Sequence, residues 1–99
     1  MTVSIQYVQL DSSDSLNTFV NKNLEKLSQK YEWLINAEVY IKEDAKDNNR
    51  GKICSIELSM PGPRIFATSN EKTFEASVKE TISDLKKQLE KRKETFKTF

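Results

Sequence analysis

Histidine is absent from this 99-residue chain, and cysteine occurs only once, as Cys54. The chain therefore lacks the commonest general base and metal ligand of proteins, and a lone cysteine completes neither a Cys/His zinc site nor an internal disulfide. The chain has two glycines, Gly51 and Gly62, and neither belongs to a glycine-rich phosphate-binding motif. We therefore expect no metal, no cofactor, no small-molecule substrate and no enzymatic activity.

Long apolar runs are also missing. No stretch approaches the roughly 20 apolar residues that cross a bilayer, and the start, "MTVSIQYVQLDSS", lacks the basic and apolar regions of a secretory signal. Cys54 lies in "KICSIELSM", where it alternates with polar residues, and this favours a small buried side chain over a reactive thiolate. Because a single cysteine suits a reducing compartment, we expect a cytoplasmic protein without membrane contact.

Charge is unevenly distributed, although the net charge is only +1. From Leu85 to Phe99 the chain has six basic and two acidic side chains, so this end carries +4 and the rest of the chain −3. A basic end on a slightly acidic body favours an anionic partner. The alternative is an ordinary solvated helix end, because surface helices are often rich in Lys and Glu.

Hydrophobic periodicity predicts four strands and two helices. Alternating apolar residues predict strands over 2–8, 36–43, 52–60 and 64–69. Ser13 is the expected N-cap of a helix that ends near Tyr31, and Asn70 or Thr73 is the expected cap of a second helix that reaches the basic end.

The resulting order, β-α-β-β-β-α, predicts an α+β fold with both helices on one face of a four-stranded, mainly antiparallel sheet. Because the sequence has no internal repeats and no linker, we expect residues 1–99 to form a single domain. The residues expected to meet in the core are Leu24, Val39, Ile56 and Leu85.

The second helix has an apolar side and a basic side. The apolar side consists of Phe74, Val78, Ile82, Leu85, Leu89 and Phe96. A neighbouring sector holds Lys79, Lys86, Lys93 and Lys97, and the charge continues around the helix at Lys87 and Lys91. Arg92 falls on the apolar side, which indicates that the helix has passed the end of the sheet there. The first helix has an apolar stripe that consists of Leu16, Val20, Leu24, Leu27 and Tyr31. Its other side carries Lys22, Lys26 and Lys30.

Two long segments carry a resemblance to a known family. The segments "FVNKNLEKLSQKYEWLINAEVYIKE" and "FEASVKETISDLKKQLEKRKETF" resemble the ribosome hibernation-promoting factor and ribosome-associated inhibitor family, also known as the sigma-54 modulation family. In its last helix that family typically has a D-K-L-x-x-Q-L-x-K-x-K-x-K pattern, which corresponds here to residues 83–93. The similarity extends along essentially the whole chain and rests on the ordered combination of segments.

The resemblance implies a fold similar to double-stranded-RNA-binding domains and a specific mode of action. Members dock on the small ribosomal subunit between head and body, where messenger and transfer RNA would lie, and silence idle ribosomes. The partners implied are this subunit and its rRNA, with a separate ribosome modulation factor for short forms, which this chain resembles. We expect a monomer when free. The RNA-binding residues implied are Lys86, Lys87, Lys91, Arg92 and Lys93, and more loosely Lys22, Lys26 and Lys30. Lys79 and Lys97 join this set from the helical pattern.

The chain departs from the family pattern early in the last helix. Ser77, Val78 and Lys79 stand where the family usually has A-I-D, and Glu75 stands where an aromatic residue is common. Two alternative functions remain open: a protein-interaction module whose basic helix docks an acidic partner, and a generic double-stranded-RNA binder. The latter domain usually begins its second helix with a basic K-K-x-A-K motif, which is missing here. Phe96 and Phe99 are candidates for base stacking or for packing at the chain end.

Overall fold

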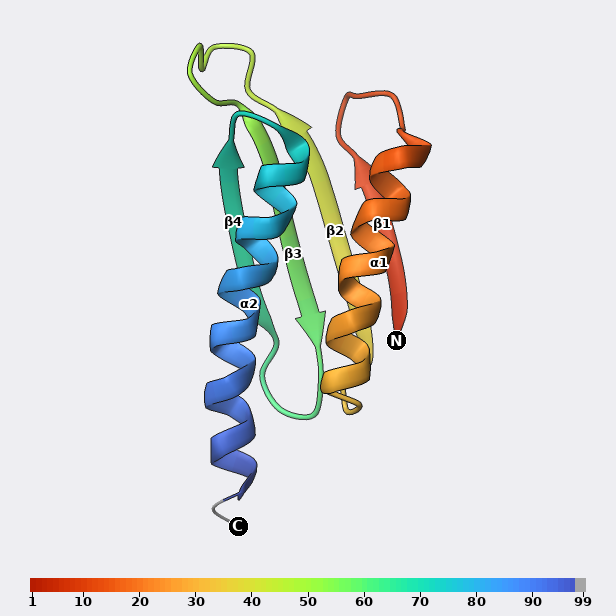
Figure 1. The fold of residues 1–99 in the computed structure, drawn as a ribbon, viewed down its shortest axis with the longest axis vertical. Helices are drawn as coiled ribbons and strands as arrows, with labels where there is room; N and C mark the ends of the chain where they lie inside the picture. Colours follow the sequence, from red (N-terminus) through yellow and green to blue (C-terminus); the bar gives the residue numbers. More distant parts are fainter. Residues whose placement is uncertain (98–99) are drawn as a thin grey trace.

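The computed structural model describes the backbone of residues 1–97 and the side chains of residues 1–95. It contains the predicted elements in the predicted order (Figure 1). The fourth strand extends two residues further than the alternating pattern indicated. The elements are β1 (Thr2–Tyr7), α1 (Asp14–Lys30), β2 (Asn36–Glu43), β3 (Lys52–Ser59), β4 (Ile65–Glu71) and α2 (Phe74–Lys97).

The four strands form one sheet in the order β1-β2-β3-β4. β1 and β2 are parallel because α1 carries the chain back to the starting end of the sheet, whereas β2, β3 and β4 are antiparallel neighbours. Both helices lie on the same face of this sheet, side by side (Figure 1). The predicted α+β fold is confirmed.

Hydroxyl side chains begin both helices. The Ser13 hydroxyl accepts a hydrogen bond from the Leu16 N–H at 3.3 Å, and the Thr73 hydroxyl accepts one from the Ala76 N–H at 3.1 Å. Each satisfies a backbone donor that has no partner within its helix. Thr73 is therefore the cap of α2, and the other predicted cap, Asn70, bonds elsewhere.

The core lies between the helices and the sheet. Leu24 of α1, Leu85 of α2, Val39 of β2 and Ile56 of β3 are all completely buried, as predicted. Burying such side chains provides most of the free energy that holds the helices on the sheet.

Two polar residues of α2 are buried where that helix crosses β3. The Cys54 N–H donates to the Ser77 hydroxyl at 3.0 Å, and the Ser77 hydroxyl donates to the Ser69 carbonyl at 2.7 Å. The Thr81 hydroxyl donates to the Cys54 carbonyl at 3.1 Å. Ser77, one of the departures from the family pattern, thus links α2 to two strands.

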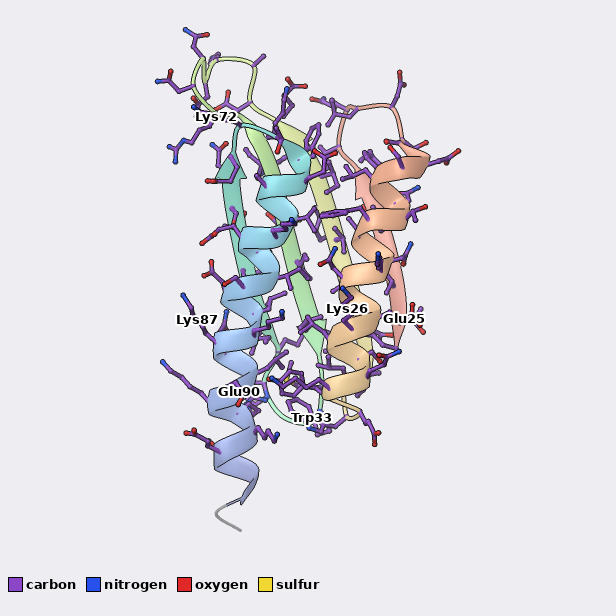
Figure 2. The ribbon with its side chains drawn as sticks, in the orientation of Figure 1. Glu25, Lys26, Trp33, Lys72, Lys87 and Glu90 are labelled. Atoms are coloured by element: carbon purple, nitrogen blue, oxygen red, sulfur yellow. The ribbon has the colours of Figure 1, made fainter. Side chains whose placement is uncertain are left out.

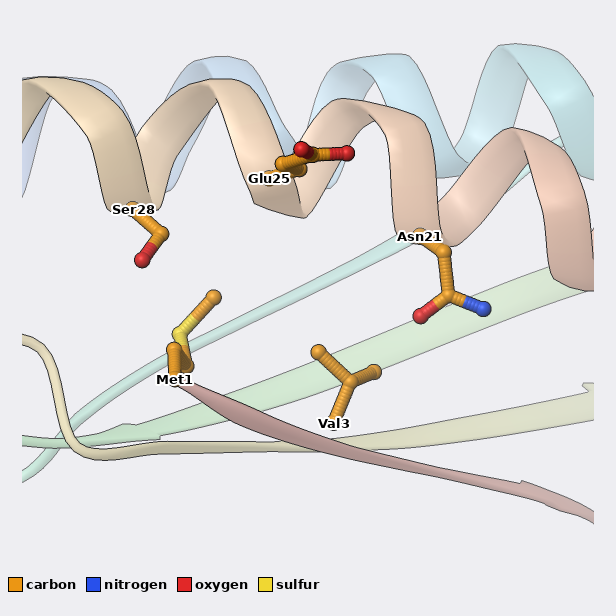
Figure 3. A pocket seen from close by; sticks show the side chains of 5 residues that line it. All are labelled: Met1, Val3, Asn21, Glu25 and Ser28. Carbon is orange, nitrogen blue, oxygen red and sulfur yellow. The ribbon is translucent and has the colours of Figure 1, made fainter.

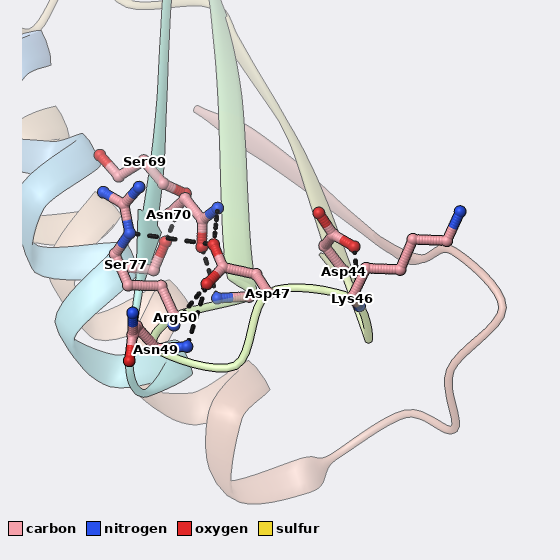
Figure 4. Close-up of polar contacts among 9 residues, drawn as sticks. Asp44, Lys46, Asp47, Asn49, Arg50, Ser69, Asn70 and Ser77 are labelled. Atoms are coloured by element: carbon pink, nitrogen blue, oxygen red, sulfur yellow. Dashed lines mark hydrogen bonds and ion pairs between the residues drawn. The ribbon is translucent and has the colours of Figure 1, made fainter.

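The loop between β2 and β3 is held by its own side chains (Figure 4). The Asp47 carboxylate accepts hydrogen bonds from the backbone N–H groups of Arg50 at 2.9 Å and Asn49 at 3.1 Å, which lower the pKa of Asp47. Asn70 accepts from the Gly51 N–H at 2.6 Å and ties the loop to β4. Figure 1 places this loop at the opposite end of the molecule from the last turns of α2.

Candidate nucleic-acid interface

The basic side chains of α2 occupy two different directions around that helix. Lys79, Lys86 and Lys93 are spaced by seven residues, about two turns, so they follow one flank. This flank faces α1, because the Lys79 ammonium lies 6.0 Å from the centre of the Phe19 ring on α1. Lys87 and Lys91 are exposed, and Figure 2 shows Lys87 pointing away from α1.

The lysines of α1 complete a basic strip along the line where the helices meet. Lys22, Lys26 and Lys30 are all exposed and recur every four residues. Figure 2 places Lys26 on the side of α1 that looks toward α2. We call this strip the basic seam and define it as Lys26 and Lys30 of α1 with Lys79, Lys86 and Lys93 of α2.

One acidic residue, Glu90, lies within the basic seam and joins its two sides. Its carboxylate accepts a hydrogen bond from the Tyr31 hydroxyl and lies 3.2 Å from the Lys30 ammonium. The Tyr31 hydrogen bond, followed by that of Lys30, lowers the pKa of Glu90. The Glu90 hydrogen bond is the main cause that raises the pKa of Lys30. Glu90 thus sets the spacing of the helix ends while it neutralises part of the local positive charge.

Tyr31 is positioned for this contact by packing. It is completely buried, and its ring meets Trp33 edge to face with 5.6 Å between centroids. Burial is the largest cause of the raised pKa of Tyr31, followed by the Glu90 hydrogen bond. Sequence reasoning placed Tyr31 on the apolar stripe but did not find its link to Glu90, because 59 positions separate the two residues.

The side chain of Arg92 bonds to the body of the protein. Its guanidinium donates to the Pro63 carbonyl at 3.0 Å and to the Pro61 carbonyl at 3.4 Å, in the turn between β3 and β4. Arg92 thus bonds to the turn that follows the end of β3, in line with the inference that the helix has passed the end of the sheet there, and its long side chain fastens the helix to that turn. In that turn Gly62 has φ +96, and a Cβ there would approach Arg92 to 3.2 Å.

The other candidates from the sequence are Phe96, Lys97 and Phe99 at the chain end and Cys54 in β3. The side chains of Phe96, Lys97 and Phe99 lie outside the described part of the structure. Cys54 is completely buried, and burial raises the pKa of its thiol to about 11, so the thiol is protonated at neutral pH. Among the described residues, no group of three or more His, Cys, Asp or Glu side chains could hold a metal ion.

The opposite face of the sheet has a different character. Glu38 and Glu57 face outward, because their neighbours Val39 and Ile56 point into the core, and the two glutamates are directly opposite each other in adjacent strands. The Glu57 carboxylate is paired with Arg64 at 2.7 Å. Adjacent carboxylates weaken the attraction of this face for phosphate groups, whereas the basic seam concentrates lysines on the helix side. The described helices include none that is long and apolar enough to cross a membrane.

Comparison with solved structures supports this fold assignment. A ribosomal subunit interface protein from Coxiella burnetii is 20% identical with a TM-score of 0.83, and the match covers 94% of this chain and 98% of that one. The Thermus thermophilus Protein Y N-terminal domain is 18% identical with a TM-score of 0.79, covering 92% and 98%. At these identities the likeness shows the fold.

Comparison with protein families identifies the chain more directly. A search of curated proteins found no match. The family model described as "Sigma 54 modulation protein / S30EA ribosomal protein" matches residues 3–97, nearly the whole chain. The combination of this match with the β-α-β-β-β-α fold leads to one conclusion: the chain belongs to the sigma 54 modulation protein / S30EA ribosomal protein family.

Proposed function

We propose that this protein binds the small ribosomal subunit and inhibits translation by idle ribosomes. In this proposal the helix face occupies the channel for messenger and transfer RNA and contacts rRNA there. The observation that carries the proposal is the basic seam, which concentrates lysines from two helices that are far apart in sequence. Family membership supports ribosome association, and the partner's chemistry follows from the charge.

The physics of phosphate binding favours this arrangement. Each lysine that approaches a phosphate displaces condensed counterions, which gives strong binding with little dependence on base sequence. Folded RNA is recognised largely by its shape and its backbone, so a protein that acts identically on every ribosome has no need to read base edges. Two rows of lysines on adjacent helices provide such a shape-dependent contact.

The proposed contacts divide the basic residues into two groups. The residues assigned to phosphate contacts are Lys22, Lys26, Lys30, Lys79, Lys86, Lys87, Lys91, Lys93 and Lys97. Arg92 is assigned a positioning role, because both ends of its guanidinium already donate to carbonyl groups of the β3–β4 turn. It keeps the end of α2 on the body of the protein, and thereby holds Lys91 and Lys93 in place.

The proposal has consequences for location and partners. A protein that binds ribosomes works in the cytoplasm, and we expect it to be a monomer before binding. Where ribosomes are paired during hibernation, a separate ribosome modulation factor would be required in addition to this domain.

Cosedimentation on sucrose gradients tests the proposal and separates it from its alternatives. We expect the protein to migrate with purified small subunits at low salt and to be released as salt rises. A protein-interaction module for an acidic partner would stay at the top of the gradient. A generic double-stranded-RNA binder would bind small subunits, large subunits and an unrelated RNA duplex equally, and either result would contradict the proposal.

A further inference from the structure

β1 forms an edge of the sheet and has a hydrogen-bonded neighbour on one side only. The Thr2 N–H donates to the carbonyl of Ile35, just before β2, at 3.1 Å, and the Val8 N–H donates to the carbonyl of Ile41 in β2 at 2.8 Å. Because backbone groups of successive residues in a strand point to opposite sides, those of Val3, Ile5 and Tyr7 point away from the sheet.

This edge lacks the features that usually keep strand edges from pairing. Residues 1–10 contain no charged side chain, no proline and no glycine. The other edge strand, β4, is protected: the Gln88 side chain donates to the Phe66 carbonyl at 3.0 Å, and Arg64 and Lys72 flank the strand. The contrast indicates that the β1 edge remains available to a partner strand.

A crevice of about 250 Å³ lies beside this edge, between β1 and α1 (Figure 3). Met1, which precedes β1, and Val3 of β1 form an apolar floor, and Asn21, Glu25 and Ser28 of α1 form a polar wall. The Glu25 side chain is exposed and makes no hydrogen bond or ion pair within the described part of the chain. The Asn21 amide nitrogen is already bonded to the Asn17 carbonyl at 2.9 Å, which leaves the amide oxygen as an acceptor.

These surroundings fit a particular kind of side chain. An apolar floor accommodates the methylene stem of a lysine or arginine, and the oxygens of Glu25 and Asn21 accept hydrogen bonds from its cationic head. A carboxylate without a partner at the mouth of the crevice disfavours an acidic side chain by direct repulsion.

We propose that the β1 edge binds an extended segment of another protein that carries an arginine or lysine. The segment adds to β1 as a further strand, and its basic side chain enters the crevice toward Glu25. A second copy of this chain is a poor occupant, because its own β1 strand, residues 2–7, has no basic side chain to offer. The crevice lies on the flank of α1 away from α2, so it stays open when the helix face is covered (Figures 1 and 3).

To test this proposal, the isotope-labelled full chain is titrated with synthetic peptides and its amide signals are followed by NMR. The probe is the acetylated, amidated heptapeptide Thr-Val-Thr-Arg-Thr-Val-Thr, with matched peptides that carry norleucine or glutamate in place of arginine. We expect shifts in the amide signals of Val3, Ile5 and Tyr7, and about tenfold tighter binding of the arginine peptide than of the norleucine peptide. Every second residue of the added strand directs its N–H group toward β1. N-methylation of these residues should abolish binding, whereas N-methylation of the residues between them should not.

A variant of the protein tests whether the crevice causes the preference for the arginine peptide. Glu25→Gln should remove the advantage of the arginine peptide, and the control Glu80→Gln, an exposed position on α2, should retain it. Equal binding of the arginine and norleucine peptides to the wild type, no binding at all, or shifts confined to the helix face would overturn the proposal. Concentration-dependent shifts at Val3, Ile5 and Tyr7 without peptide would show that a second copy is the occupant, and would overturn it as well.

Discussion

The hydroxyl of Tyr31 donates a hydrogen bond to the carboxylate of Glu90 and so joins the end of α1 to the later turns of α2. Lys30 approaches the same carboxylate from solvent. The contact fixes the distance between the two sides of the basic seam at the end where the positive charge is densest. If the seam binds rRNA, Tyr31 and Glu90 act on binding through the placement of the lysines.

Removing the Tyr31 hydroxyl should destabilise the protein. Tyr31→Phe removes the buried hydroxyl and leaves the Glu90 carboxylate without this hydrogen bond. The urea concentration at the midpoint of unfolding should therefore fall. Tyr40→Phe is the matched control, because the Tyr40 hydroxyl bonds to Glu38 at 3.2 Å on the exposed sheet face. Equal midpoints for the two variants in equilibrium urea unfolding would show that the Tyr31 contact adds no stability.

The lowered pKa of Glu90 predicts a stability difference that depends on pH. A carboxylate with a folded-state pKa below its ordinary value of 4.5 stabilises the protein above that value, and the contribution is lost as pH falls through the folded-state pKa. The unfolding free energy of the wild type should therefore exceed that of Glu90→Gln at pH 7, and this difference should disappear at acidic pH. Denaturation curves at several pH values measure the gap, and a gap that is constant with pH would contradict the assignment.

The core assignment predicts a large effect of truncating Leu85. Because this side chain is completely buried between α2 and the sheet, Leu85→Ala should lower the unfolding free energy by about 2–5 kcal/mol. The neighbouring exposed substitution Lys86→Ala should change it by no more than about 0.5 kcal/mol. Chemical denaturation followed by circular dichroism measures both, and comparable losses would show that the face of α2 has been misassigned.

Arg92 and Lys87 should differ in how their removal affects RNA binding. Lys87→Ala should reduce the slope of log affinity against log salt by about one, because one phosphate contact is lost. Arg92→Ala should instead increase amide exchange in the last turns of α2, and Arg92→Lys should only partly restore protection because lysine lacks the forked guanidinium. Unchanged exchange in Arg92→Ala would contradict the positioning role.

Local patterns were sufficient to predict most of the fold. Alternation in β2 and β3 and the three-and-four spacing of Leu16, Val20, Leu24 and Leu27 each report which side of an element is buried, and a single face of burial forces both helices onto one side of the sheet. The basic residues were also visible, because charge and helical spacing are properties of the sequence itself.

Contacts between distant residues were not predictable in this way. The Arg92 bonds to the β3–β4 turn depend on a long side chain folding back over a turn whose position only the assembled sheet defines. The crevice beside β1 has the same origin, because its floor and wall come from different elements. Periodicity describes how one element faces the core and contains no information about which side chains meet across it.

The most direct test of the central claim is a comparison of two charge-reversal variants with equal net charge. One changes Lys86, Lys87 and Lys91 of the helix face to Glu, and the other changes Lys42, Lys46 and Lys72 at exposed positions outside it. Binding to small subunits and inhibition of a cell-free translation system should be lost in the first variant and retained in the second, while both stay folded by circular dichroism. If the folded first variant binds and inhibits like wild type, or if both variants fail equally, the helix face is not the ribosome-binding surface.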